Sequence, residues 1–215
     1  MPDAPRIKIC GITRLDDARH AVEAGAWAIG MIFWPGSKRA CPVDEAQRIG
    51  TALRRQVELV GVFVDETLDE VAAIAEAVPL TVVQLHGDEG PRYCDEVARR
   101  TGAKVMKAAR VRTAGDVDRL AVFHTDLHLV DTHHPTLRGG TGETFDWRLL
   151  RGRRSSVPLV LSGGLTPANV ADAIAAVQPW AVDVASGVEA APGVKDPALV
   201  DAFAAAVRET AGVVA

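Results

Sequence analysis

The sequence predicts a single-domain (β/α)8 barrel, a TIM barrel, that spans residues 1–215. Short apolar runs alternate with amphipathic stretches of helical length along the whole chain. Most of the runs are apolar almost throughout and rich in Val and Ile, as in parallel strands that are covered on both faces. The length of 215 residues also suits a barrel, since such barrels use about 200–250 residues as one unit. A doubly wound open sheet is the alternative, because eight strands can also lie open.

The predicted strands are eight in number and leave room for a helix after each of them. They are IKIC (7–10), AIGMIF (28–33), LVGVFV (59–64), LTVVQL (80–85), KVMKAARV (104–111), LHLVD (127–131), PLVLS (158–162) and AVDVAS (181–186). Between them lie DDARHAVEAG, VDEAQRIGTALRR, LDEVAAIAEAV, DEVARR and ANVADAIAAV. Ala, Val and Leu recur three and four residues apart in these stretches, which predicts helices with one buried face.

Helix-boundary signals agree with this order of elements. Thr166-Pro167 and Asp196-Pro197 each offer an N-cap side chain followed by Pro at the first helical position, and Thr13 to Asp16 resembles a capping box. Gly25 and Gly102 stand where helices are expected to end. The chain has no Ser/Gly-rich linker, so we expect one domain.

Charge and cysteine content restrict the class of partner and the compartment. The net charge of -4 gives no support to a nucleic acid or an anionic membrane as partner. Cys10, Cys41 and Cys94 show no CxxC spacing, so neither a disulfide framework nor a structural zinc site is expected. No apolar stretch has the length of a secretory leader or a membrane span. We therefore expect a cytoplasmic protein.

Two of the predicted strands end in residues that could do acid–base chemistry. In a barrel of this kind the functional residues lie where the strands end and in the loops that follow. The first strand ends in Cys10 and the sixth in Asp131. A buried Cys is as often only a small apolar side chain, and a strand-end Asp can also stabilise a loop. The segment HHPTLRGGTGETFDW after the sixth strand contains Gly139, Gly140 and Gly142, which favours a loop that covers a ligand.

Glycines follow the seventh and eighth strands, in LSGGL and ASGVE. Gly163 and Gly164 stand in the first of these loops, and Ser186 and Gly187 in the second. Glycines allow backbone N–H groups to approach an anion closely. Because these two loops are the ones with which barrels most often bind phosphate, the sequence predicts a phosphorylated ligand.

Further polar residues are expected around the mouth of the barrel. Lys38 and Arg39 follow the second strand, and a loop arginine is well shaped to hold a carboxylate by two parallel bonds, although exposed basic residues are often only solvated. Gln84 and His86 lie at the end of the fourth strand. His86 could be a neutral donor, a packed ring or, with His133-His134, a metal ligand. No set of three or four ligands is evident, so no metal is expected.

These same segments resemble the phosphoribosylanthranilate isomerase family of tryptophan biosynthesis. The resemblance rests on KICGIT, GMIFWPGSKR, GVFVD, VQLHGDE, VDT with the downstream GGTGETFDW, LSGGLTPANV and VDVASGVE. They follow one another in the family's order and span almost the whole chain. The loop after the second strand departs slightly from the pattern, with Cys41 in a position to which we assign no role.

The resemblance implies a (β/α)8 barrel that catalyses a cofactor-free Amadori isomerisation. N-(5-phosphoribosyl)anthranilate becomes 1-(2-carboxyphenylamino)-1-deoxyribulose 5-phosphate, an aldose–ketose isomerisation of aromatic amino-acid biosynthesis. By resemblance Asp131 is the general acid and Cys10 the general base, which requires that a cationic or donor-rich site lower the pKa of its thiol. The remaining expected site residues are Arg39 for the anthranilate carboxylate, Gln84, His86 and Asp183 for other parts of the substrate, and Gly163, Gly164, Ser186 and Gly187 for the phosphate. The only expected partner is the small phosphosugar, and a monomer and a homodimer both stay open.

Three other functions are weighed against this one. A metal-dependent pentose-phosphate epimerase would use His86, His133 and Asp131 around a divalent ion. A non-catalytic phosphosugar-binding barrel would have no need of a base at the end of the first strand and an acid at the end of the sixth. A dual-substrate isomerase that also serves histidine biosynthesis is disfavoured because such barrels tend to use aspartates at both catalytic strand ends, where this chain has Cys10.

Overall fold

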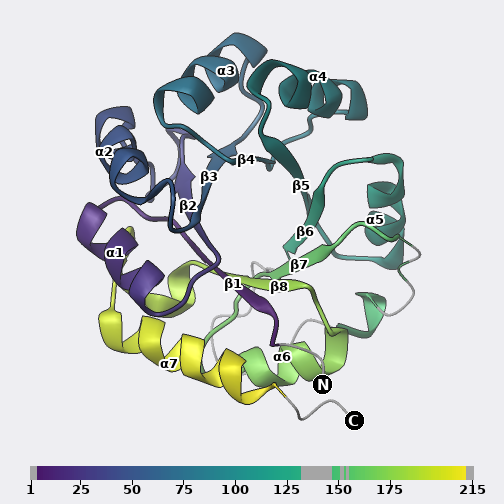
Figure 1. The fold of residues 1–215 in the computed structure, drawn as a ribbon. Coiled ribbons are helices and arrows are strands. Elements are labelled where there is room, and N and C mark those ends of the chain that lie inside the picture. The colour runs from purple at the N-terminus through teal and green to yellow at the C-terminus, as the bar shows by residue number, and fades with distance from the viewer. Residues whose placement is uncertain (1–3, 132–146, 151–152, 154, 212–215) are drawn as a thin grey trace.

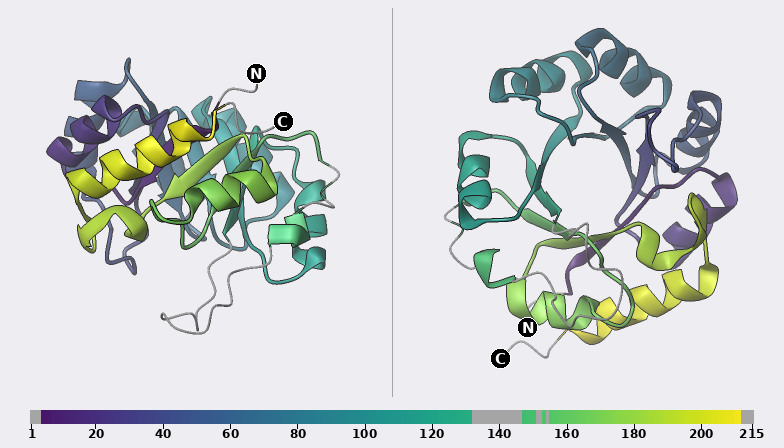
Figure 2. Two further views of the ribbon diagram at one scale, coloured as in Figure 1. Left: turned by 90° about the horizontal axis from the view of Figure 1, so that it is seen from below. Right: turned by 180° about the vertical axis from the view of Figure 1, so that it is seen from behind.

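The computed structural model confirms a closed barrel of eight parallel strands, in the order β1-β2-β3-β4-β5-β6-β7-β8. It describes residues 4–131, 147–150, 153 and 155–211. Figure 1 looks along the barrel and shows the strands as an inner ring with the helices outside it. The view from behind in Figure 2 shows the same outer ring, in which α7 lies against both α1 and α6.

The elements agree closely with the predicted order. The barrel strands are β1 (Arg6–Cys10), β2 (Ala28–Ile32), β3 (Glu58–Phe63), β4 (Val82–Leu85), β5 (Lys104–Arg110), β6 (Leu127–Asp131), β7 (Leu159–Ser162) and β8 (Ala181–Val184). The helices are α1 (Leu15–Glu23), α2 (Val43–Leu53), α3 (Leu68–Ala77), α4 (Pro91–Thr101), α5 (Ala114–Arg119), α6 (Val170–Val177) and α7 (Pro197–Glu209). Short 3-10 helices η1 (Leu120–Val122), η2 (Trp147–Leu150) and η3 (Ser186–Val188) and a hairpin of β9 (Glu189–Ala191) and β10 (Val194–Lys195) complete the described part.

Two of the predicted helix starts are wrong. Thr13 does not cap α1: Arg14 occupies the N-cap position, and the Thr13 hydroxyl donates a hydrogen bond to the carbonyl of Gly193. Thr166-Pro167 does not start α6 either, since a turn intervenes and Asn169 is the N-cap residue. The Thr13 hydroxyl is thus used by the loop at the mouth of the barrel, whereas at Thr166 the backbone N–H donates to the Asn169 side chain at 2.8 Å.

The other boundary signals are confirmed. Asp196 caps α7, because its carboxylate accepts hydrogen bonds from the backbone N–H groups of Ala198 and Leu199, and Pro197 is the first helical residue. Gly102 ends α4 with a φ of 66°, in the left-handed region, and Gly25 follows the end of α1 with a φ of 93°.

The core has two layers, one inside the barrel and one between the strands and the helices. The inner layer includes Cys10, Ala28, Val60, Val62, Val82, Met106, Ala108, Leu127, Leu129, Val160 and Ala181. Side chains two apart on a strand share a face. Continuing each strand by two residues therefore places Gln84, Asp131, Ser162 and Asp183 on the inner face at the C-terminal end of the barrel, and Lys8 on that face below Cys10.

Within the described residues, none of the helices combines the length and the apolar character needed to cross a bilayer. The glycine-rich stretch that was expected to cover a ligand, with Gly139, Gly140 and Gly142, lies outside the described residues.

Candidate active site

A cavity of ≈ 290 Å³ lies at the C-terminal ends of β6, β7 and β8. Its lining combines an acidic strand end, two glycine-rich loops and one arginine. The lining residues are Arg39, Asp131, Ser162, Gly163, Gly164, Leu165, Asp183, Val184, Ala185 and Ser186. The structure thus brings together the predicted general acid, the predicted carboxylate-binding arginine and most of the predicted phosphate-binding residues.

Cys10 ends β1 and is 6% exposed. It pairs with Gly30 of β2, and a Cβ atom at Gly30 would lie only 2.8 Å from the Cys10 sulfur. Burial raises the pKa of the Cys10 thiol, and this effect outweighs the cations Lys8 and Lys195, which lower it. The expectation of a lowered Cys10 pKa is therefore wrong: the cationic neighbours are present, but desolvation of the thiolate is the larger effect.

Asp131 faces His86 across the cavity mouth. Nε2 of His86 lies 3.6 Å from Oδ2 of Asp131, and each side chain is about one-fifth exposed (20% and 21%). The Gln84 amide nitrogen lies 3.2 Å from Nδ1 of His86, so a donating Gln84 amide leaves the proton of a neutral imidazole on Nε2, towards Asp131. Gln84 Oε1 is buried and has no hydrogen-bond partner among the described residues.

Arg39 reaches the cavity from the loop after β2, held by a bidentate ion pair. Its Nε and Nη2 donate to the carboxylate of Glu189 at 2.8 to 3.0 Å. Glu189 also accepts from the buried Lys195 at 2.9 Å. Gly11 has a φ of +74°, and a Cβ there would lie 2.8 Å from Cδ of Arg39, so only glycine leaves room for this side chain to cross.

The two predicted phosphate loops pack against each other. Gly163 and Gly164 turn the chain after β7 with φ values of 99° and 65°. A Cβ atom at Gly187 would collide with the carbonyl oxygen of Leu165, so the loop after β8 lies in direct contact with the loop after β7. Ser186 lines the cavity beside them.

Asp183, a predicted substrate-binding residue, is engaged by two side chains of the barrel interior, which was not expected. It lines the cavity but is only 5% exposed. Its carboxylate accepts one hydrogen bond from Lys8 Nζ at 2.7 Å and another from the Ser162 hydroxyl at 3.0 Å. The lysine within the otherwise apolar KIC segment was a signal in the sequence for this buried pair.

A second cavity of ≈ 390 Å³ adjoins the site on the side of β3, β4 and β5, and His86 lines it. Lys107 and Arg110 lie in its wall, and Lys107 Nζ donates to the buried Glu89 at 2.6 Å. This ion pair fixes the loop that carries His86, because Glu89 also accepts from the backbone N–H of Gly87.

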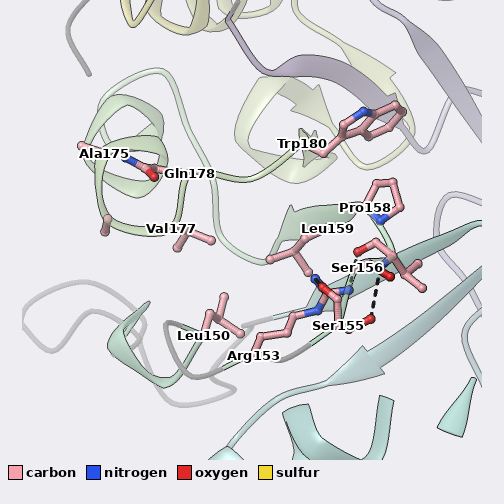
Figure 3. A pocket seen from close by; sticks show the side chains of 12 residues that line it. Leu150, Arg153, Ser155, Ser156, Pro158, Leu159, Ala175, Val177, Gln178 and Trp180 are labelled. Atoms are coloured by element: carbon pink, nitrogen blue, oxygen red, sulfur yellow. Dashed lines mark hydrogen bonds between the residues drawn. The ribbon is translucent and has the colours of Figure 1, made fainter. Parts of the chain in front are cut away.

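A larger cavity, of ≈ 600 Å³, lies elsewhere, at the N-terminal ends of β7 and β8. Figure 3 shows Arg153 and Ser155 on one side of it and Gln178 and Trp180 on others. None of the predicted site residues lines it. Because barrels of this class bind ligands at the opposite end of their strands, the smaller cavity with Asp131 is the candidate active site.

Among the described residues, no three His, Cys, Asp or Glu side chains gather in an arrangement that could hold a metal ion. His133, which the epimerase alternative would use, and its neighbour His134 lie outside the described residues.

Comparison with known proteins gives consistent matches over the length of the chain. The family model described as N-(5'-phosphoribosyl)anthranilate (PRA) isomerase matches residues 7–206. The N-(5'-phosphoribosyl)anthranilate isomerase of Citrifermentans bemidjiense is 47% identical over 206 residues, which cover 96% of this chain and 98% of the relative.

Solved structures agree. The phosphoribosyl anthranilate isomerase of Thermotoga maritima superposes with a TM-score of 0.87 at 44% identity, over 95% of this chain and 99% of that one. Another, in complex with reduced 1-(o-carboxyphenylamino)-1-deoxyribulose 5-phosphate, gives 0.83 at 42% identity with the same coverage of 95% and 99%. A structure of monomers generated from the dimeric Thermotoga maritima enzyme gives the same values, 0.83 and 42% over 95% and 99%, so at least one relative of this chain is a dimer.

Proposed function

Since the chain belongs to the N-(5'-phosphoribosyl)anthranilate isomerase family and converts its substrate to 1-(2-carboxyphenylamino)-1-deoxyribulose 5-phosphate in tryptophan biosynthesis, we propose that Asp131 is its general acid and Cys10 its general base. One observation carries this proposal: Asp131 lines the cavity that the two glycine-rich loops bound, while Cys10 ends the strand that neighbours β8 on the other side. The substrate lies between them, with its phosphate at the loops.

The first step opens the furanose ring. The protonated Asp131 carboxyl gives its proton to the ring oxygen, the bond between that oxygen and C1 breaks, and the nitrogen lone pair forms the C1=N bond. His86 Nε2, which lies 3.6 Å from Asp131 Oδ2, stabilises the negative charge that Asp131 carries once it has given up this proton. This step needs no metal and no cofactor, because a positioned proton donor supplies all of the assistance.

The second step removes the proton from C2. The iminium withdraws electrons from C2, and the Cys10 thiolate takes that proton and becomes a thiol. The C2–H electron pair forms the C1=C2 bond of the enolamine, and the C1=N electron pair returns to nitrogen. The enolamine then tautomerises: the C2 hydroxyl loses its proton, C1 gains one, and the C2 ketone completes the isomerisation. A thiolate whose pKa burial has raised is a stronger base for a C–H bond than an ordinary one, although less of it is ionised at neutral pH.

The experiment that tests this proposal follows the loss of substrate fluorescence on adding the purified protein, with EDTA present. Full activity in EDTA is expected. Intact-mass analysis during turnover should show the unmodified chain mass throughout, because Cys10 accepts a proton and forms no covalent bond. A Cys10 adduct with the mass of the substrate would assign nucleophilic catalysis in place of base catalysis.

We expect Arg39→Ala to raise KM about 10–100-fold, because charge-assisted hydrogen bonds to the anthranilate carboxylate are lost in the bound substrate and the transition state alike. The value of kcat should change much less. Steady-state kinetics of Arg39→Ala and of Arg48→Ala, an exposed arginine paired with Glu45 on α2, measure the difference. A large fall in kcat with an unchanged KM would reassign Arg39 to the stabilisation of the transition state.

We expect Gly187→Ala to raise KM about tenfold or more, since its Cβ forces the loop after β8 away from the Leu165 carbonyl and displaces the phosphate contacts. The matched control is Gly90→Ala, whose Cβ would meet nothing within 4 Å. Inorganic phosphate as a competitive inhibitor gives a second readout, and its inhibition constant should rise in Gly187→Ala only. Equal inhibition of both variants would place the phosphate elsewhere.

A further inference from the structure

Lys8 is a fully buried lysine inside the barrel, directly below Cys10. It has 0% exposure, lies two residues before Cys10 on β1, and therefore shares its inward face. Gly30 shows how close the two side chains come. A Cβ at Gly30 would lie 2.8 Å from the Cys10 sulfur and 3.1 Å from Lys8 Nζ, so the two atoms flank the same point.

The pairing of Lys8 with Asp183 does not by itself explain a buried lysine. An ammonium has three donors, and Asp183 Oδ1 accounts for one of them. Buried ion pairs are weak sources of stability compared with apolar side chains of similar volume, because both charges lose their hydration. Around the pair, the interior of the barrel is lined by apolar side chains, so a role beyond packing is indicated.

We propose that Lys8 is a positioning residue for the isomerase reaction: its ammonium, held in place by Asp183, stabilises the thiolate form of Cys10 and fixes the sulfur below the substrate. This inference rests on the proposed role of Cys10 as the base. Lys8 itself exchanges no proton with the substrate. The proton from C2 passes to the Cys10 sulfur, and Lys8 stays an ammonium before and after.

The charged groups around Cys10 come from four elements. Lys8 on β1 and Lys195 on β10 lower the pKa of the thiol, Asp183 on β8 raises it, and Arg39 in the loop after β2 also interacts with it. After burial, which raises the Cys10 pKa, Lys8 has the largest effect. The pKa of Lys8 is raised although burial alone would lower it, because Asp183 and Cys10 favour the ammonium. Lys8 therefore keeps its charge near neutral pH.

The test measures how fast iodoacetamide alkylates Cys10 as a function of pH, by mass spectrometry of the Cys10 peptide. Burial raises the pKa of Cys41 to about 12 and that of Cys94 to about 11, and both are replaced by Ser to leave one thiol. For Lys8→Met we expect the midpoint of the pH profile to rise by about 1–3 units, with roughly tenfold slower alkylation per unit below the midpoint.

The partner variant has the opposite expected sign. Asp183→Asn removes the anion that raises the Cys10 pKa, so its midpoint should fall and alkylation at a given pH should become faster. If Lys8 and Asp183 served only the packing of the barrel, both variants would loosen the site and both would react faster. Faster alkylation in Lys8→Met would therefore overturn the proposal.

Two further variants keep the test decisive if Lys8→Met does not fold. The double variant Lys8→Met/Asp183→Asn leaves no unpaired charge, and its midpoint should lie above that of Asp183→Asn alone. Gly30→Ala keeps both charges but pushes the sulfur and the ammonium from their present positions, and should raise the midpoint less than Lys8→Met. Unchanged midpoints in both would contradict the proposal.

The control is Lys104→Met, which removes another lysine of a barrel strand, one whose carboxylate partner is Glu58 and which is not among the groups acting on Cys10. Its alkylation profile should equal that of the parent chain. The test also separates this inference from the proposed function. An active Cys10→Ala would refute the role of Cys10 as base, whereas an inactive Cys10→Ala together with an unshifted Lys8→Met would refute the role of Lys8 alone.

Discussion

Asp131→Asn is expected to lower kcat by about 10²–10⁴-fold, the range that a positioned general acid contributes. Asparagine has nearly the same shape as aspartate and preserves the contact with His86, but it has no carboxyl proton to give to the furanose oxygen. Ring opening then depends on water. Substrate fluorescence, followed at saturating concentration with EDTA present, measures the loss, and KM should change little because the side-chain volume is kept.

The control for this variant is Asp126→Asn, at the opposite end of the same strand. Asp126 precedes β6 at its other end, where its carboxylate accepts a hydrogen bond from the backbone N–H of Val105 at 2.8 Å. Asp126→Asn should keep kcat within about twofold of the parent, since surface-loop carboxylates far from the reacting atoms seldom affect it. If Asp131→Asn retained a similar share of activity, another proton donor would open the ring.

Cys10→Ser is expected to lower kcat by a similar factor of about 10²–10⁴. Serine fits the space beside Gly30, but its hydroxyl ionises far less readily than a thiol, so the base for C2 is lost. KM should stay near the parent value because serine is close to cysteine in size and keeps the shape of the site. Single-turnover kinetics with substrate deuterated at C2 provide the readout: the slow step in Cys10→Ser should show a primary isotope effect.

Cys94→Ser is the matched control, since Cys94 is also a buried thiol, 2% exposed, but packs on α4 in the layer between strands and helices. It should cost stability and leave kcat unchanged. A Cys10→Ser variant that folds and turns over at the parent rate would remove Cys10 from the mechanism and leave Asp131 as the only assigned proton-transfer group.

The strands were predictable because parallel barrel strands are buried on both faces and so are apolar throughout. The fourth strand begins at Val82 instead of Leu80, since the Leu80 N–H bonds the Ala75 carbonyl to end α3. The eighth ends at Val184 because Ser186 starts a 3-10 helix. Such ends depend on local hydrogen bonds that periodicity does not encode.

The sequence could predict those site residues that lie at the end of a strand or in the loop that follows it. Arg39, Asp131, Gly163, Gly164 and Ser186 were assigned in this way, and they line one cavity. Lys8 and Glu189 were missed as site residues because their partners are remote, 175 and 150 positions away along the chain. The direction of the Cys10 pKa was missed because it depends on whether burial or the nearby cations have the larger effect, and the sequence does not give that balance.

The ion pair between Lys8 and Asp183 joins the first barrel strand to the last, and this has a consequence for how the chain is made. Lys8 leaves the ribosome long before its partner exists, and an ammonium without a counter-ion is unfavourable in an apolar interior. The first strand therefore has no stable place inside a nascent, incomplete barrel until residues near 183 arrive. Contacts of such long separation form late and slowly. A truncated chain that lacks the eighth strand should therefore leave Lys8 without its carboxylate partner and the barrel open.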